Sequence, residues 1–300
     1  MADEHASPPS EPDEQMEPTP VLEPEETKES LISRLNPMRL FQKNSVAFQL
    51  RDAQSLMEKK LFAQATNAFQ KTLEMDPENV EAFKGLGQVL MRKGGRTNIE
   101  SSLKQFHEAT LRDPLNEEIY VLNSQVMQAL GRTKESNLEQ KKALSLRTLR
   151  KDPKNAIAAN NIGIAMVRLG KIAMAISYFQ KSIDSDRSYD MPRRNLASTY
   201  LQLAEKETNP QKQKDLLGKA SVEISKALEI GVSPPTLVVQ TRILIMTGDT
   251  EQALEVINKA NDLQPGSKLI MTVKQGVLEK LNRLTEARET YEGAKSFAPA

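Results

Sequence analysis

The sequence contains no cysteine, no tryptophan and only two histidines. Without cysteine, the chain has no disulfides, no thiol catalysis and no cysteine-based metal sites. His5 and His107 have neither a nucleophile nor a second metal ligand at a useful spacing. Glycine-rich phosphate loops and zinc-protease motifs are also missing. These absences predict a protein that is not an enzyme and that uses no cofactor or metal ion.

Long apolar runs are missing as well. No stretch approaches 18 uncharged apolar residues, and the most apolar region, 237–246, is interrupted by Gln240 and Arg242. The first residues show no basic segment followed by an apolar one, so no secretory signal is predicted. We therefore expect a soluble, cytoplasmic chain without a transmembrane segment.

Charge is distributed very unevenly along the chain. The net charge of the whole is +1, but residues 1–30 carry ten acidic residues and one basic residue, which gives −9 there and +10 elsewhere. Residues 1–29 also hold six prolines and few apolar residues, a composition that predicts disorder. The segment is either a solubilising tail or an acidic lid that lies in a basic groove at low salt.

A proline-ended pattern recurs seven times from Val46 onward. Five segments end in proline, and two end at an equivalent position: Pro77, Pro114, Pro153, Arg187, Val232, Pro265 and Pro299. A small residue lies five positions before each of these, and in six of seven a large residue lies eight before and a small one twelve before. This spacing places the three side chains on one helix face. A second helix precedes each, and such pairs must stack because one pair alone cannot bury its apolar face.

The pattern resembles the tetratricopeptide repeat. The fourth segment matches the family at Ile162, Gly163, Met166, Gly170, Ala175 and Phe179. The resemblance implies an all-α, right-handed superhelical solenoid of antiparallel helix pairs, with about seven repeats over residues 46–300. Repeats two, three and five carry insertions, which we expect between the first and second helix, projecting from one edge. The third repeat departs from the pattern, with Lys141 and Ser145 where a small and an aromatic residue are expected.

A short segment, residues 30–45, lies between the acidic tail and the array. Residues 30–36 read as a short capped helix stopped by Pro37, and Leu40 and Phe41 follow. We expect this segment to cap the first repeat. A docking motif for a partner or a weak membrane contact are the alternatives.

The resemblance also implies that the first helix of each pair lines a concave groove that binds extended or helical peptides. Asn161 and Asn195 occupy matching places in consecutive repeats, and carboxamides can pair with a peptide backbone. Asn160, Arg194 and Arg168 would add groups suited to an acidic peptide or a C-terminal carboxylate. The alternative is an ordinary solvated helix surface.

Two further stretches are candidates for the same groove. Lys84, Gln88 and Arg92 follow four-residue steps and form one stripe of the second repeat. Val238 and Val239 would form an apolar wall for the helix of a partner. The competing interpretations are a plain charged face for the first stretch and packing between repeats for the second.

These features predict a non-catalytic adaptor that binds a protein partner, as a peptide or helix, in the concave groove. A self-assembling scaffold, with the chain as a homo-oligomer, is the alternative. Nucleic-acid binding is less favoured, because the aromatic side chains that stack on bases are scarce and a body of +10 is only modestly basic.

Overall fold

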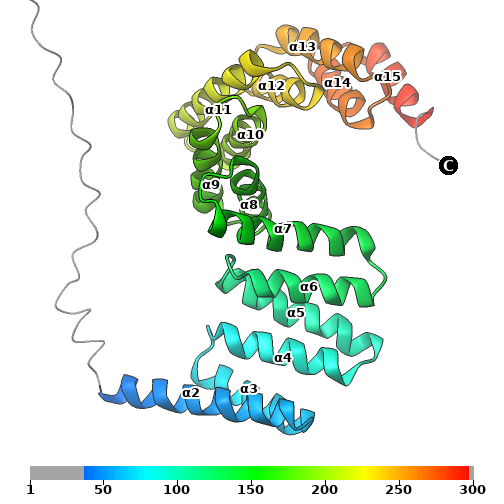
Figure 1. Ribbon diagram of the computed structural model, residues 1–300. Helices are drawn as coiled ribbons and strands as arrows, with labels where there is room; N and C mark the ends of the chain where they lie inside the picture. Colours follow the sequence, from blue (N-terminus) through cyan, green and yellow to red (C-terminus); the bar gives the residue numbers. More distant parts are fainter. Residues whose placement is uncertain (1–36, 297–300) are drawn as a thin grey trace, which may run out of the picture.

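The structure is a computed structural model that describes residues 37–296, and within this range it contains fourteen α-helices and no strand. The helices form seven antiparallel pairs (Figure 1). The first helices are α2 (Pro37–Glu58), α4 (Val80–Lys93), α6 (Glu117–Ala129), α8 (Ala156–Arg168), α10 (Asp190–Lys206), α12 (Pro234–Thr247) and α14 (Lys268–Lys280). The second helices are α3 (Phe62–Met75), α5 (Arg96–Arg112), α7 (Thr133–Lys151), α9 (Ile172–Ser185), α11 (Pro210–Ile230), α13 (Thr250–Leu263) and α15 (Leu284–Ser296). The predicted all-α repeat solenoid is confirmed.

The first helix begins earlier than the repeat pattern indicates. Helix α2 starts at Pro37, so the expected boundary at residue 46 falls inside a continuous helix. Proline suits this position, because the first turn of a helix needs no backbone N–H donor. The acidic tail 1–29 and the short helix expected over residues 30–36 lie outside the described residues.

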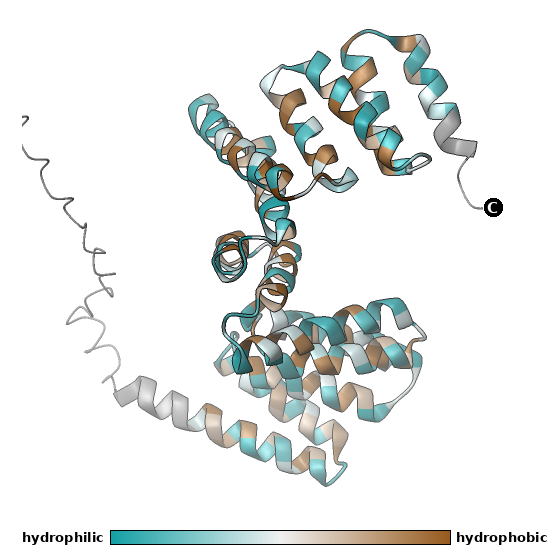
Figure 2. Ribbon diagram, turned by 45° about the horizontal axis from the view of Figure 1, so that its top comes forward, coloured by the Kyte–Doolittle hydropathy of each residue, from teal (hydrophilic) through white to brown (hydrophobic). Residues whose placement is uncertain are grey.

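The helix ends follow from local chemistry. Asn79 and Asn155 cap α4 and α8, and each side chain accepts a hydrogen bond from the backbone N–H three residues on. Gly170 and Gly248 have φ angles of 70° and 96°, a left-handed conformation that glycine adopts without strain just after a helix. Figure 2 shows hydrophobic and hydrophilic residues alternating along the helices, as expected when one stripe of each helix is buried.

Close packing within a pair depends on glycine facing phenylalanine. A Cβ atom on Gly163 would lie 2.6 Å from the ring of Phe179, and one on Gly87 would lie 2.4 Å from the ring of Phe106. Both rings are buried. The predicted alternation of small and large residues is therefore the contact that sets how closely the two helices approach.

The insertion of the third repeat lies elsewhere than predicted. The turn between α6 and α7 is only residues 130–132, as short as residues 169–171 in the fourth repeat. Ser136 of α7 packs against Ser124 of α6, with 3.1 Å between their hydroxyl oxygens, so the start of α7 is in the usual register. The extra residues lengthen the C-terminal end of α7, which has 19 residues where α9 has 14. In repeats two and five the turns are also short, residues 94–95 and 207–209, and the extra residues lengthen the helices beside them: α5 has 17 residues and α11 has 21.

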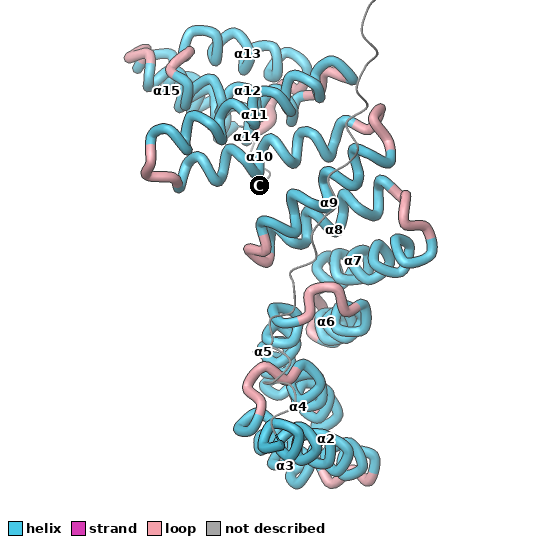
Figure 3. The backbone as a smooth tube through the Cα atoms, turned by 90° about the vertical axis from the view of Figure 1, so that its left-hand side faces the viewer, coloured by secondary structure: helices cyan, strands magenta, loops and turns pink. Residues whose placement is uncertain are grey.

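The longer α7 changes the direction of the array. Five extra residues in a continuous helix rotate its later face by about 140°, at about 100° per residue. Ser145 accordingly accepts a hydrogen bond from Asn161 of α8, at 3.2 Å. No Cα atom of α6 lies within 8 Å of one in α8, whereas the first helices of every other neighbouring pair approach more closely. The helix axes turn at this junction (Figures 1 and 3).

Beyond the turn the array curves as an arc. In Figure 1, α8, α10 and α12 lie on the inner side of the arc, and α9, α11 and α13 lie on the outer side. The first helices thus occupy the concave side, as the family resemblance implies.

Candidate functional site

An accessible stripe on the inner side belongs to α8. Ile157, Asn161, Ile164 and Arg168 lie at helical spacing on one face of this helix. Ile157 has an exposed fraction of 61%, which is high for an aliphatic side chain. Arg168 is exposed and forms no ion pair with any described residue. The stripe therefore offers an apolar anchor point and an unpaired cation.

Two hollows flank this stripe, and both include Ile164 and Arg168. The first, of about 150 Å³, lies between α7 and α8. It is lined by Leu138, Lys141, Lys142, Asn161, Ile164, Ala165 and Arg168. The second, of about 160 Å³, lies between α8 and α10. It is lined by Ile164, Val167, Arg168, Phe179, Asn195, Ser198, Thr199 and Gln202.

The two asparagines at matching places, Asn161 and Asn195, both donate hydrogen bonds within the protein, Asn161 to Ser145 and Asn195 to Asn160. Asn195 donates a hydrogen bond from Nδ2 to Oδ1 of Asn160 at 2.8 Å, and Asn160 donates to the hydroxyl of Tyr189 at 3.4 Å. Asn160 is only 2% exposed. The expectation that it meets a ligand is therefore corrected, because its amide joins the fourth and fifth repeats. Asn195 is half-buried and lines the second hollow, so it remains within reach of a ligand.

Tyr189 completes this inter-repeat contact. Burial raises the pKa of Tyr189, nearby Asp190 raises it further, and the positive charge of Arg194 opposes the shift. Arg194 itself is half-buried. Its neighbour Arg193 is engaged elsewhere, in an ion pair with Glu223 at 2.9 Å.

The stripe predicted in the second repeat is only partly available. Lys84 is buried, and its Nζ lies 2.9 Å from a carboxylate oxygen of Glu81 and 2.5 Å from one of Glu118 in the next repeat. Burial lowers the pKa of Lys84, but the hydrogen bonds to Glu118 and Glu81 outweigh it, so the pKa is raised. Lys84 is thus a structural link between repeats and not a free ligand, which corrects the prediction. Gln88 is half-buried and Arg92 is exposed.

The apolar wall predicted at Val238 and Val239 is internal. Val238 belongs to the core cluster of α12, α13 and α14, and Val239 to the cluster that joins α12 to α10 and α11. Both are buried. Packing between repeats, the alternative interpretation, explains these two residues.

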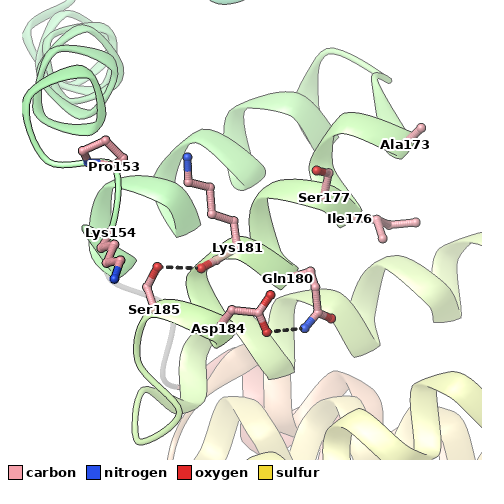
Figure 4. A pocket seen from close by; sticks show the side chains of 9 residues that line it. All are labelled: Pro153, Lys154, Ala173, Ile176, Ser177, Gln180, Lys181, Asp184 and Ser185. Atoms are coloured by element: carbon pink, nitrogen blue, oxygen red, sulfur yellow. Dashed lines mark hydrogen bonds between the residues drawn. The ribbon is translucent and has the colours of Figure 1, made fainter. Parts of the chain in front are cut away.

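A larger hollow, of about 790 Å³, lies on the opposite, outer face (Figure 4). It follows the exposed side of α9 and the turn that contains Lys154. Gln180 donates to Asp184 at 2.9 Å, and Ser185 donates to the carbonyl oxygen of Lys181 at 2.8 Å. These two bonds join polar groups of the hollow along the helix. The hollow also provides a control surface for tests of the inner side.

Within residues 37–296, no group of three His, Cys, Asp or Glu side chains is placed to hold a metal ion. None of the helices described is both long and apolar enough to cross a membrane.

Sequence reasoning missed the contribution of α7 to the inner side. Leu138, Lys141 and Lys142 were not predicted as site residues, because a second helix is expected to lie behind the first. The signal was present in the composition of α7, which has six basic and two acidic residues. Its three-residue spacing of Leu138, Lys141 and Leu144 also marks one exposed face.

Comparisons with known proteins agree with this architecture. Models of the tetratricopeptide repeat match residues 50–97 and 156–189. A solved tetratricopeptide-repeat protein of Thermus thermophilus superposes with a TM-score of 0.50 at 19% identity, over 61% of this chain and 92% of that one. This likeness concerns the fold.

Among curated proteins, trafficking protein particle complex subunit 12 of Mus musculus is 25% identical over 136 residues, which is 45% of this chain and 17% of that protein. The Homo sapiens protein is 24% identical over the same length, 18% of its own. The match thus spans less than a fifth of these relatives. Taken with the seven stacked helix pairs, the family matches show that this chain carries tetratricopeptide repeats in an all-helical solenoid.

Proposed function

We propose that this chain is a cytoplasmic, non-catalytic adaptor that binds a protein partner along the inner side of the array, across α8 and α10. Tetratricopeptide-repeat proteins generally mediate protein–protein interactions and scaffolding, and the family is typically non-catalytic. The observation that carries the proposal is the α8 stripe, where Ile164 and Arg168 line hollows on both sides and Arg168 has no acidic partner among the described residues.

The second hollow suits the backbone of an extended peptide. Asn195, Ser198 and Gln202 offer amide and hydroxyl groups that can both donate and accept hydrogen bonds. Arg168 would attract an acidic side chain or a C-terminal carboxylate of the partner. The two curated relatives are named as subunits of a complex, which is in keeping with such a role.

The choice of test variant follows from the hydrogen bonds. Changing Asn195 to alanine would also remove its bond to Asn160, so loss of binding could reflect a loosened repeat junction. Ser198 is a cleaner position, because it lines the second hollow and a phenylalanine there would fill much of it. Ser177 is the matched control, since it lines the hollow on the outer face (Figure 4).

The experiment uses the immobilised full chain to capture partners from native lysate, with cross-linking and mass spectrometry to locate the contacts. We expect Ser198→Phe to reduce capture at least about tenfold, roughly the loss of one well-packed anchor in an interface. Ser177→Phe should leave capture unchanged. Equal capture by both variants, or cross-links confined to α9, would refute the inner-side site. Recovery of only the chain itself would favour the scaffold.

A further inference from the structure

The hollow between α7 and α8, which we call the α7–α8 trough, exists because the array turns there. In the other neighbouring repeats, the two first helices pack against each other. Helix α6, however, has no Cα atom within 8 Å of one in α8. The face of α7 that bears Leu138 and Lys141 is therefore open on the inner side, next to Asn161, Ile164 and Arg168.

The trough combines exposed aliphatic side chains with unpaired positive charge. Leu138, which lines the trough, is 45% exposed, and Ile164 on the α8 side is partly exposed. Lys141 and Arg168 line the trough, are exposed, and have no acidic partner among residues 45–292. Accessible aliphatic side chains beside unpaired cations indicate a site for another chain segment.

One lysine of the trough is already neutralised. Lys142 lies 2.6 Å from a carboxylate oxygen of Glu139, and its Nζ is 5.5 Å from the centre of the Tyr120 ring. Even so, the trough is lined by three basic residues, Lys141, Lys142 and Arg168, and by no acidic residue. The occupant of the trough should therefore be acidic and carry aliphatic side chains.

The chain itself contains a segment of this chemistry. Residues 16–26 read Met-Glu-Pro-Thr-Pro-Val-Leu-Glu-Pro-Glu-Glu, with four glutamates around an aliphatic pair, Val21 and Leu22. Prolines at three of these eleven positions disfavour a helix, so the segment would dock in an extended form. We propose that residues 16–26 bind in the α7–α8 trough of the same chain, with Val21 and Leu22 against Leu138 and Ile164.

The connecting chain is long enough for this contact. Fourteen residues lie between Leu22 and Pro37, where α2 begins, and this stretch of chain spans up to about 50 Å when extended. Helix α7 belongs to the third pair, and packed helices are about 10 Å apart, so only a few such steps separate it from α2. The contact would cover Ile164 and Arg168, which the proposed partner site across α8 and α10 also uses. The segment would then compete with the partner.

The absence of cysteine makes the test direct. Thr19→Cys and Gln140→Cys introduce the only two thiols, one within the segment and one at an exposed position of α7. Nitroxide labels on both, measured by electron–electron double resonance in the full chain, report the distance between them. We expect a narrow, short distance at low salt and a broad, longer distribution near 1 M salt, where the screening length is about 3 Å.

Charge reversal provides the decisive comparison. Lys141→Glu with Arg168→Glu should reduce the ratio of short to long distances at least about fivefold, because two attractive contacts become repulsive. Lys154→Glu with Lys181→Glu makes the same change in net charge on the outer face and should have no effect (Figure 4). Adding Glu23→Lys and Glu25→Lys to the trough variant should restore the short distance.

Any one of the following results would overturn the proposal. They are a broad distribution in the unaltered chain at low salt, an equal loss in the outer-face control, and a short distance that survives reversal of the trough. A short distance that vanishes on dilution with unlabelled chain would also refute it, since the contact would then join two molecules. No partner takes part, so the outcome is separate from that of the capture experiment.

Discussion

Gly163 is the position where a single added methyl group should test the packing of a helix pair. It lies in the middle of α8, and a Cβ atom there would be 2.6 and 2.7 Å from two ring carbons of Phe179. Ordinary contacts of this kind are nearly an ångström longer. Because Phe179 is buried in the cluster that includes Ile162 and Met166, its ring cannot turn aside. Gly163→Ala must therefore push α8 and α9 apart.

Two opposing terms set the size of the effect. Alanine is favoured over glycine in a helix by about 1 kcal/mol. Forcing an extra methyl group into a close-packed core costs about 1–3 kcal/mol. With the clash directed at a ring that cannot move away, we take the upper part of that range. The expected net destabilisation is then about 1–2 kcal/mol.

Gly218 is the matched control for the helix-propensity term. It also lies within a helix, α11, but a Cβ atom there would meet nothing within 4 Å. Gly218→Ala should therefore stabilise the chain by about 0.5–1 kcal/mol, the opposite sign.

The assay is urea unfolding followed by circular dichroism, since the chain has no tryptophan to report by fluorescence. Native-state hydrogen exchange of α8 and α9 measures the same change locally, which matters because repeat arrays can unfold in parts. Adding Phe179→Leu to Gly163→Ala should recover part of the loss. If Gly163→Ala stabilises the chain as Gly218→Ala does, the account of close glycine–phenylalanine packing is wrong.

Two further predictions concern links between neighbouring elements. Because the pKa of Lys84 is raised in the folded state, its contribution to stability is present below the unfolded pKa of 10.5 and is lost as pH rises through the folded value. The free energy of unfolding should thus fall more steeply above pH 10 in the unaltered chain than in Lys84→Met, and equal slopes would contradict the ion-pair account. Tyr120→Phe removes a buried hydrogen bond of 2.8 Å to the carbonyl oxygen of Pro114 and should cost about 1–2 kcal/mol in urea unfolding. A neutral result would mean that water replaces the hydroxyl there.

The fold could be predicted because the repeat pattern depends on residues that are close together in the sequence. Spacings such as that of Ala175, Phe179 and Ser182 depend only on helix geometry, and each recurrence supports the others. The third repeat was harder, because aligning it on its final proline assumes that extra residues form a loop. In α7 they extend a helix, and a helix with five more residues presents a different face.

The candidate site was predicted less well than the fold, for a physical reason. A polar residue on a first helix can face either a ligand or the neighbouring repeat, and the sequence of one helix does not distinguish them. Lys84 and Asn160 lie at the same place in their repeats, and both turned out to bind groups of the next repeat. Arg168, which lies near the end of α8, has no such neighbour in the part of the chain that the structure covers and stays accessible.

The separation of α6 from α8 also bears on how the array unfolds. In a linear array, the cooperativity of unfolding passes from each unit to the next only through their shared interface. At this junction the interface consists of α7 against α8, together with the Tyr120 ring beside Ile162 and Met166. The three pairs before it and the four after it are therefore coupled through the core cluster that α7 shares with α8 and α9, and not through their first helices. Whether the two parts of the array unfold together should depend on that cluster.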